Sequence, residues 1–428
     1  MTAAFRLSGP RPPEGAVRQE DLRDLNLKVV FQHILDAGSP ISRTELATAT
    51  GLTRPTITRI AEELLAGRLI TEKGVTHNGR AGRPRVGLTL SDRGPAGLGL
   101  DIRADGLAAC VVDLTGTVRH LTFAPMPPTG RDAEAVLGSL IRMGCEAIEA
   151  ATVKELTVVT ATLAVPGPVD GGVVRIAPAL GWRDVDAGTF LAGLGVPCVV
   201  DNEANLAALG ELYAGDDPLG SFLYVSGGLG IGAGIVLDGS LMRGARGWSG
   251  ELGHVTVEPE GAACACGSRG CLETYASTGA ILGALPGATN RTDAREGAVP
   301  HGAGPGEAGD IFERINPDSV ITNRAEAADP AALAALDRAG SALGIALSGA
   351  VNVLDIDTVL LGGSFALLSS WLTDSVRAEI DRRVLTASWS PVTVRPTLFG
   401  PDAAVIGAAL TSIDQIRRRP TTWLARQS

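Results

Sequence analysis

Residues 251–273 read ELGHVTVEPEGAACACGSRGCLE, and this short stretch carries four side chains suited to one metal ion. His254 is followed by Cys264, Cys266 and Cys271, a set of one imidazole and three thiolates that is typical of tetrahedral zinc sites. Because four protein ligands leave no open coordination position, we predict a structural Zn²⁺ that holds a loop rather than activating water. The alternative is three free or redox-active cysteines beside an unrelated histidine.

The composition indicates a large folded chain. The 428 residues are enough for two or three domains, and 45% hydrophobic with 20% charged residues can form a sizeable core. A mean hydropathy of +0.20 excludes a wholly disordered chain. No stretch reaches the ~20 uninterrupted apolar residues of a membrane-spanning helix, and residues 1–15 lack the apolar core of a signal peptide. Six cysteines do not make a disulfide scaffold, so we expect a cytoplasmic protein without a membrane partner.

The net charge of −10 is unevenly distributed. Residues 1–93 hold 14 Lys+Arg and 10 Asp+Glu, whereas the remainder holds 23 and 37. A basic N-terminal region on an acidic body suggests that nucleic acid binds at the N-terminal region.

The first 93 residues show a helical pattern after a tail. Residues 1–20 are rich in Pro, Gly and Arg and are expected to be flexible. A helix should run from Asp21 to Gly38, because apolar residues recur near its period at Leu22, Leu25, Val29, Ile34 and Leu35.

Two more helices follow with their own start signals. Ser42 and Glu45 have the spacing of a capping box, and Gly51 supplies the turn. Thr53 should cap the third helix, whose first turn tolerates Pro55.

The third helix has an apolar and a polar face. Ile57, Ile60, Ala61 and Leu64 should point inward, which leaves an outer set near the N-terminus: Arg54, Thr56, Thr58 and Arg59. With strands expected at 69–72 and 86–90, residues 21–93 form a predicted winged helix-turn-helix whose third helix contacts DNA bases. The alternative is a small helical cap with solvated arginines.

The segment between these strands, residues 79–85, reads GRAGRPR. Its cations, Arg80, Arg83 and Arg85, could enter a narrow minor groove. An ordinary basic linker is the alternative.

Residues 94–428 have the pattern of an α/β body. Strand-like stretches separated by helical ones are LGLDI, GLAACVVDL, VRHLTFAP, LTVVTATLAV, PCVVD, SFLYVS, GIVL and TVLLGG. A turn is expected at Thr115-Gly116, and residues 286–310 should be a surface loop or insertion.

Two further motifs could bind ligands. The glycine run at 227–234 follows a strand and could approach a phosphate, although a tight hairpin is equally compatible with it. Asp201-Asn-Glu-Ala-Asn205 places carboxylates and amides at a strand end, where they suit a polyhydroxylated ligand. Helix capping by Asp201 or Asn202 is the alternative and is compatible with ligand binding.

The chain resembles the ROK family, which covers bacterial repressors, open reading frames and sugar kinases. The motifs that carry this resemblance are Glu251–His254, Cys264–Glu273 and Asn202–Asn205. The resemblance runs from about residue 21 to 415, and like segments occur at 165–170, 362–363 and 401–404. It implies an α/β, two-lobed, actin-like (ribonuclease-H-like) sugar kinase fold. The lobe boundary would lie near residue 205, with a C-terminal helix returning to the first lobe. Within the family, the chain resembles the repressor branch of xylose and N-acetylglucosamine repressors.

The kinase motifs of the family are degenerate here. Where the kinases have Asp-x-Gly-Gly-Thr, this chain has Asp101-Ile-Arg-Ala-Asp105, and Leu229 replaces the threonine of the second phosphate loop. Glu203 occupies the position of the catalytic aspartate. Because phosphoryl transfer depends on positioning the phosphates, we expect no kinase activity and no catalytic residue.

The sugar-facing positions of the family mostly remain, and the resemblance assigns sugar contacts to Asn202, Glu203, Glu251, His254 and Glu273. Pro178-Ala179-Leu180 departs from relatives that carry an asparagine there. We predict a sugar-responsive transcriptional repressor of carbohydrate metabolism genes that binds operator DNA as a dimer or tetramer and is nucleoid-associated. In this hypothesis, sugar closes the cleft and changes the placement of the DNA-binding heads. The alternatives are an active sugar kinase with a DNA-binding head and a regulator that responds to another protein, such as a phosphotransferase-system component.

Overall fold

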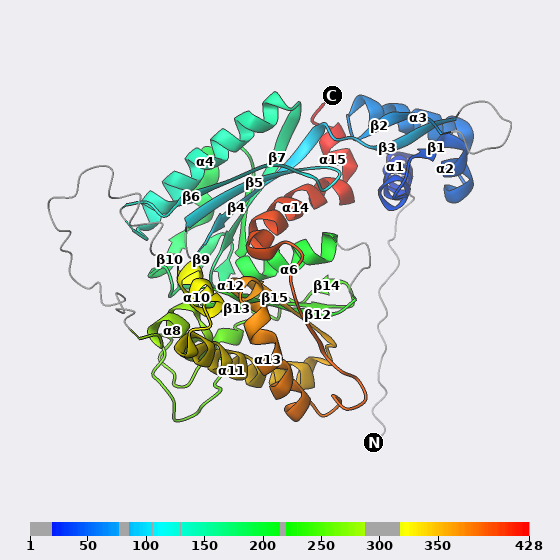
Figure 1. Cartoon of the computed structure of the whole chain (residues 1–428). Coiled ribbons are helices and arrows are strands. Elements are labelled where there is room, and N and C mark those ends of the chain that lie inside the picture. Colours follow the sequence, from blue (N-terminus) through cyan, green and yellow to red (C-terminus); the bar gives the residue numbers. More distant parts are fainter. Residues whose placement is uncertain are drawn as a thin grey trace, which may run out of the picture. The chain divides into compact units, whose positions relative to one another are not determined.

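The computed structural model describes residues 19–76, 85–103, 106–128, 130–214, 220–228, 230–286 and 317–427. The chain divides into two compact units (Figure 1). We name Met1–Ser91 with Gln415–Ser428 the head unit and Asp92–Asp414 the body. The last residues of the chain thus group with the N-terminal region, whereas the sequence pattern placed all of 94–428 in the body.

The head unit alternates helices and short strands. Its N-terminal elements are α1 (Gln19–Asp36), β1 (Ile41–Ser42), α2 (Arg43–Thr50), α3 (Arg54–Ala66), β2 (Ile70–Thr76) and β3 (Arg85–Leu90). The strands pair antiparallel in the order β1-β3-β2. The sequence did not predict β1, because this two-residue strand arises only from its pairing with β3.

The predicted caps are confirmed. The Ser42 hydroxyl accepts from the N–H of Glu45 at 3.3 Å, and the Glu45 carboxylate accepts from the N–H of Ser42 at 2.8 Å. Thr53 caps α3 by accepting from the N–H of Thr56 at 3.4 Å. These local bonds satisfy N–H groups that a helix leaves unpaired at its start.

The buried face of α1 differs from the simple periodic pattern. Leu27, Val30, Phe31 and Ile34 are buried, whereas Leu22 and Leu25 are exposed. The first turns of α1 therefore lie outside the core of the head unit.

A C-terminal helix completes that core. The side chain of Trp423, in α15 (Pro420–Leu424), is 3% exposed, and its Nε1–H donates to the carbonyl oxygen of Gly67 at 2.6 Å. A Cβ at Gly67 would overlap the Leu424 side chain, so the glycine permits this close approach. Residues more than 350 positions apart thereby share one core.

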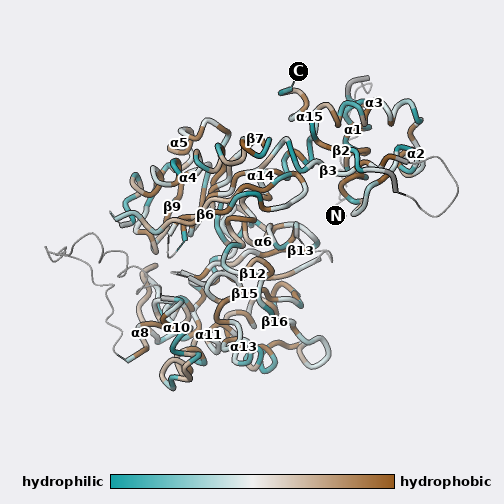
Figure 2. Tube along the Cα trace, turned by 45° about the horizontal axis from the view of Figure 1, so that its top comes forward, coloured by the Kyte–Doolittle hydropathy of each residue, from teal (hydrophilic) through white to brown (hydrophobic). Residues whose placement is uncertain are grey.

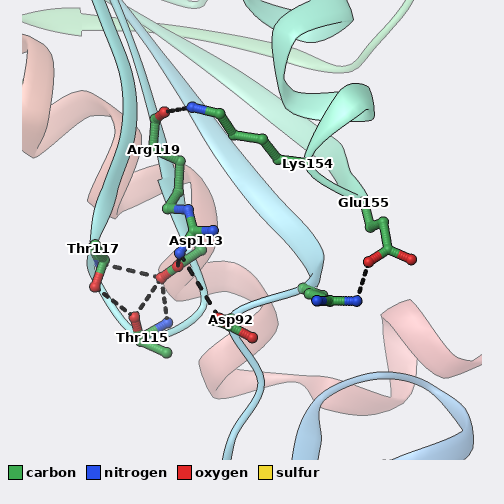
Figure 3. A network of polar contacts seen from close by, with 8 residues as sticks. Asp92, Asp113, Thr115, Thr117, Arg119, Lys154 and Glu155 are labelled. Carbon is green, nitrogen blue, oxygen red and sulfur yellow. Dashed lines mark hydrogen bonds and ion pairs between the residues drawn. The ribbon is translucent and has the colours of Figure 1, made fainter.

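The body contains two central sheets. The first has the strand order β11-β7-β4-β5-β6, in which β4 and β11 run parallel to β7. Its strands are β4 (Gly94–Ile102), β5 (Gly106–Asp113), β6 (Val118–Pro125), β7 (Leu156–Val165) and β11 (Cys198–Asn202). The predicted turn at Thr115-Gly116 is confirmed between β5 and β6 (Figure 3). There the buried Asp113 carboxylate accepts from the N–H groups of Thr115 at 2.8 Å and Thr117 at 3.1 Å.

The second sheet has the order β14-β13-β12-β15-β16. Its strands are β12 (Phe222–Gly227), β13 (Ile231–Leu237), β14 (Ser240–Leu241), β15 (Thr358–Gly363) and β16 (Thr393–Pro396). A small antiparallel sheet, β8 (Val169–Asp170), β9 (Val173–Ala177) and β10 (Trp182–Asp186), accompanies the first sheet. The predicted long strands are confirmed, whereas β8–β10, β14 and β16 were not predicted because they are short and partly exposed.

Helices form layers around and between the two central sheets (Figure 1). Helix α4 (Ala133–Val153) packs on the first sheet, with α5 (Ala187–Phe190) and the 3₁₀ helix η1 (Leu191–Leu194) beside it. Helices α11 (Pro330–Leu354) and α13 (Ser369–Arg383) pack on the second. Between the sheets lie α6 (Glu203–Ala214) and α14 (Ala403–Arg418), and the most hydrophobic stretches follow the strands (Figure 2). Shorter helices complete the body: η2 (Leu252–His254), α7 (Glu273–Ala276), α8 (Thr278–Gly283), α10 (Pro317–Glu326), α12 (Ser364–Leu367) and η3 (Gly400–Asp402).

One described helix, α11, is long and apolar enough to cross a membrane by length and composition. Its most apolar window is 61% buried against the second sheet and α13, which is typical of a core helix. The expected surface loop at 286–310 lies, apart from Pro286, outside the described residues.

Candidate functional site

A cavity of about 500 Å³ in the body is lined by residues from both central sheets. Ile102 ends β4, Asn202 ends β11 and Gly227 ends β12, and all three line the cavity, so carboxyl ends of strands from both sheets meet there. Ligands of open α/β sheets bind at this edge because loops and helix N-termini present polar groups there. The cavity is therefore the candidate ligand site of the body.

Asn202 caps α6 and also lines the cavity. Its Oδ1 accepts from the N–H groups of Ala204 at 2.9 Å and Asn205 at 3.2 Å, while its Nδ2 donates to the Gly167 carbonyl at 3.1 Å. The capping alternative is confirmed for Asn202, and it fixes the side chain at the cavity wall. Asn205 is 1% exposed, lies outside the lining set, and its amide has no hydrogen-bond partner among the described residues.

Glu203 is the carboxylate that α6 presents at its first turn. Its Oε2 accepts a 2.9 Å hydrogen bond from the Ser226 hydroxyl. Burial raises the pKa of Glu203 to about 7, with a contribution from negative charge on Glu251, and the Ser226 hydrogen bond opposes the shift. Near neutral pH this side chain can therefore be present with or without its proton.

Glu251, His254 and Glu273 reach the cavity from the segment 251–273. Glu251 precedes η2, His254 ends it, and Glu273 begins α7. Gly250 has φ +99°, and a Cβ there would overlap the Ala233 carbonyl oxygen, so the backbone can seat against β13 only with glycine. Burial and the charge of Glu273 raise the pKa of Glu251, while His254 lowers it.

The predicted metal ligands come together. The ligand atoms of His254, Cys264, Cys266 and Cys271 all lie within 4.8 Å of one another. His254 Nδ1 is 3.8 Å from Cys264 Sγ, and Cys266 Sγ is 3.7 Å from Cys271 Sγ. Tetrahedral zinc with Zn–S bonds of ~2.3 Å requires S···S separations of roughly 3.8 Å. This cluster could hold a metal ion, and its geometry fits zinc.

The glycine run at 227–234 forms a hairpin. Strands β12 and β13 pair antiparallel across it, and the N–H of Gly228 donates to the Gly230 carbonyl at 3.0 Å. Gly232 and Gly234 leave room for α6, since a Cβ at either position would meet Ala204. The hairpin alternative is confirmed, and Gly227, Gly228 and Gly230 also line the cavity.

The degenerate loop after β4 forms an ion pair in the body. Arg103 lines the cavity, and its Nη1 is 2.7 Å from Oδ1 of Asp402 in η3. Residues 104, 105 and 229, on which the comparison with kinase loops also rests, lie outside the described residues.

The predicted DNA contacts are described only in part. Arg54, Thr58 and Arg59 are exposed on α3, whereas Thr56 is half-buried and its hydroxyl lies 2.9 Å from that of Thr53. Arg80 and Arg83 lie outside the described residues, and Arg85 begins β3 with its side chain undescribed.

Some lining residues were missed from the sequence. Trp248 was identifiable as an aromatic residue in the polar, glycine-rich segment 243–250, directly before Glu251. Asp318 had no comparable signal, because its place follows from packing: its Oδ2 accepts from the Ser364 hydroxyl at 2.8 Å. The departing segment Pro178-Ala179-Leu180 does line the cavity.

Comparisons with known proteins agree with this architecture. The family model described as "ROK family" matches residues 97–415. The xylose repressor of Caldicellulosiruptor bescii is 27% identical over 408 residues, covering 93% of this chain and 98% of that protein.

Two solved structures are also similar. A ROK family transcriptional regulator, a homolog of the E. coli MLC protein, superposes with a TM-score of 0.72 at 28% identity, covering 95% of this chain and 99% of that one. A ROK family glucokinase from Streptomyces griseus, in complex with glucose and AMPPNP, gives 0.61 at 27% identity, covering 74% and 98%. Because the family model covers most of the chain and the similarity to repressors includes the head unit, this protein belongs to the ROK family, in its repressor branch.

Proposed function

We propose that this chain is a sugar-responsive, DNA-binding transcriptional repressor without kinase activity. The observation that carries the proposal is the convergence of Asn202, Glu203, Glu251, His254 and Glu273 on one cavity, in a chain that also has a head unit with exposed arginines on α3. Carboxylates, an amide and an imidazole offer the donors and acceptors that sugar hydroxyl groups require. The similarity to a xylose repressor over both units supports the same function.

The head unit acts as a winged helix-turn-helix in this proposal. Helix α3 would enter the major groove and place Arg54, Thr58 and Arg59 at base edges, with Thr56 near the backbone. Arg80 and Arg83, between β2 and β3, and Arg85, at the start of β3, would follow the minor groove. Paired heads read paired half-sites, so the active species is a homo-oligomer, a dimer or a tetramer.

The His254–Cys271 cluster binds a structural Zn²⁺. The metal would brace the loop that carries Glu251 and Glu273, so that these carboxylates keep their position in the cavity. When bound, the zinc supplies rigidity and no chemistry, because its four positions are taken by protein ligands.

The position and ion pair of Arg103 support the proposed absence of kinase activity. Family kinases have glycine at this place, whereas here the guanidinium is engaged by Asp402. To align a γ-phosphate for transfer, a kinase needs glycine-rich backbone where this chain has Arg103. Phosphoryl transfer depends almost entirely on such alignment.

The test begins with DNA fragments that the chain selects from a random-sequence pool. Arg59→Ala should weaken binding to the selected fragment at least about fivefold, since losing one base contact costs ~1–3 kcal/mol. Arg382→Ala, an exposed arginine on α13, is the matched control and should bind as wild type. Equal affinities of wild type and Arg59→Ala at the same salt concentration would contradict the role of α3.

A coupled assay for ADP production with a panel of monosaccharides tests the kinase alternative. We expect no turnover above background. Turnover dependent on one sugar and abolished by Glu203→Gln would replace the repressor proposal with a kinase that carries a DNA-binding head.

A further inference from the structure

Residues 242–250 form a strap that connects the two sheets of the body. The strap starts after β14 and ends before Glu251. Both ends are anchored to β13, by the N–H of Met242 donating to Ile235 at 2.7 Å and the N–H of Ala233 donating to Gly250 at 2.8 Å. The strap is thus fixed to the second sheet and joined covalently to the metal-binding segment.

Two polar contacts join the strap to residues on the side of the first sheet. Arg243 Nη2 lies 2.6 Å from Oδ2 of Asp201 at the end of β11. Trp248 Nε1–H donates to the carbonyl oxygen of Val169, in β8, at 3.2 Å. These bonds join parts of the body that have separate hydrophobic cores, so they hold one wall of the cavity in place.

Trp248 offers an aromatic surface to the cavity. The described aromatic lining residues are Tyr224, whose side chain is 1% exposed, and Trp248, which is 37% exposed. The Arg246 guanidinium lies 5.9 Å from the centroid of the indole ring, and the hydrogen bond to Val169 fixes the ring edge. An aromatic ring held in this way can pack against an apolar ligand face with little loss of side-chain entropy.

The charged side chains of the cavity lining restrict which ligands can pack against the Trp248 ring. Carboxyl groups in its lining are Asp101, Glu203, Glu251, Glu273 and Asp318. Of the basic side chains in the described lining, Arg103 is paired with Asp402, and His254 belongs to the metal cluster, where an imidazole binds zinc in its neutral form. A phosphate brought into these surroundings would meet mostly like charge in a medium of low dielectric constant.

From these two observations we propose that Trp248 is a ligand-contacting residue on which a sugar ring packs one C–H face, and that the carboxyl groups of the lining select against a phosphate substituent on that sugar. A pyranose ring has hydroxyl groups, which can donate hydrogen bonds to carboxylates. It also has apolar C–H patches that can pack on an aromatic ring. The inference rests on the proposed function and specifies its ligand class. Trp248 is thereby a ligand-contacting, specificity-determining residue.

The experiment uses full-length, zinc-replete protein with D-xylose, D-glucose and D-glucose 6-phosphate as probes in calorimetric titrations. We expect one of the neutral sugars to bind at least tenfold more tightly than the phosphate. Trp248→Ala should weaken that sugar at least tenfold, whereas Trp248→Phe, which keeps a ring but loses the N–H, should stay within about threefold. Trp389→Ala, at a 70% exposed position outside the lining set, is the matched control and should match wild type.

Tryptophan fluorescence supplies a second readout. The sugar should change the emission of wild type and of Trp389→Phe, and the change should be absent in Trp248→Phe. Tight phosphate binding, or equal sugar affinity in wild type and Trp248→Ala, would overturn the inference. Wild type that binds selected DNA but neither neutral sugar would overturn the inference and leave the DNA-binding part of the proposed function standing. Protein that binds neither DNA nor sugar would overturn both.

Discussion

The hydroxyl group of Ser226, on β12, donates a 2.9 Å hydrogen bond to Oε2 of Glu203 at the start of α6. This bond connects the second sheet to the helix that follows β11 of the first, inside a cavity lined by further carboxyl groups. The pKa of Glu203 is about 7 rather than the ordinary 4.5, chiefly because the group is buried.

Glu203→Gln should therefore change how stability depends on pH. A carboxyl group whose pKa is raised in the folded state favours folding below its unfolded pKa, and this contribution is lost as pH rises from 4.5 to about 7. The wild type should lose up to about 3 kcal/mol across this window, and the glutamine variant should lose less. Urea unfolding at pH 5 and pH 8 measures the difference. Glu146→Gln, at an exposed position on α4, should follow wild type; identical pH profiles for all three proteins would refute the buried-acid assignment.

Cys271→Ser should remove the metal. Its thiol is buried in the cluster, so the variant loses one of four ligands and should retain little of the roughly one zinc per chain expected for wild type. Its sugar affinity should fall and the body should melt several degrees lower, while binding to selected DNA persists. Cys145→Ser, a half-buried cysteine outside the cluster, is the control. Elemental analysis with thermal unfolding decides the matter, and an unchanged zinc content in Cys271→Ser would count against the site.

Gly407→Ala should destabilise the body. A Cβ at this position of α14 would overlap the carbonyl oxygen of Leu206 in α6, where the two helices cross closely beside Gly210. Overpacking of this kind costs about 1–3 kcal/mol. Gly349→Ala on α11 meets nothing within 4 Å and should instead be neutral or stabilising by up to ~1 kcal/mol. Denaturant unfolding of both variants distinguishes the outcomes, and equal stability would show that the crossing has room to adjust.

Trp423→Ala should destabilise the head unit selectively. The variant loses a buried indole and leaves the Gly67 carbonyl without its 2.6 Å hydrogen bond. Truncation of a buried tryptophan costs about 3–5 kcal/mol. Hydrogen exchange should accelerate in α1 and α3, and DNA affinity should fall, while the body keeps its protection. The exposed Trp389→Ala is again the control, and unaltered protection in α1 would argue against a C-terminal contribution to this core.

Much of the candidate site could be predicted from the sequence because its signals are local. The four predicted metal ligands lie within one segment, and Asn202 and Glu203 lie where β11 ends and α6 begins, so spacing and resemblance were enough to select them. Asn205 illustrates the limit: it belongs to the same motif but is buried on α6 and lies outside the cavity lining.

By itself, the sequence determined the helix caps at Ser42 and Thr53, the long buried strands and the four residues of the His/Cys cluster. These features depend on residues within a few positions of each other, whose backbone and side-chain preferences act before any tertiary contact forms. Only the tertiary structure decided that Trp248 meets Val169, that Arg103 pairs with Asp402, and that Trp423 completes the core of the head unit. Such contacts join residues distant in sequence, and they are selected by the packing of whole sheets and helices rather than by local preference.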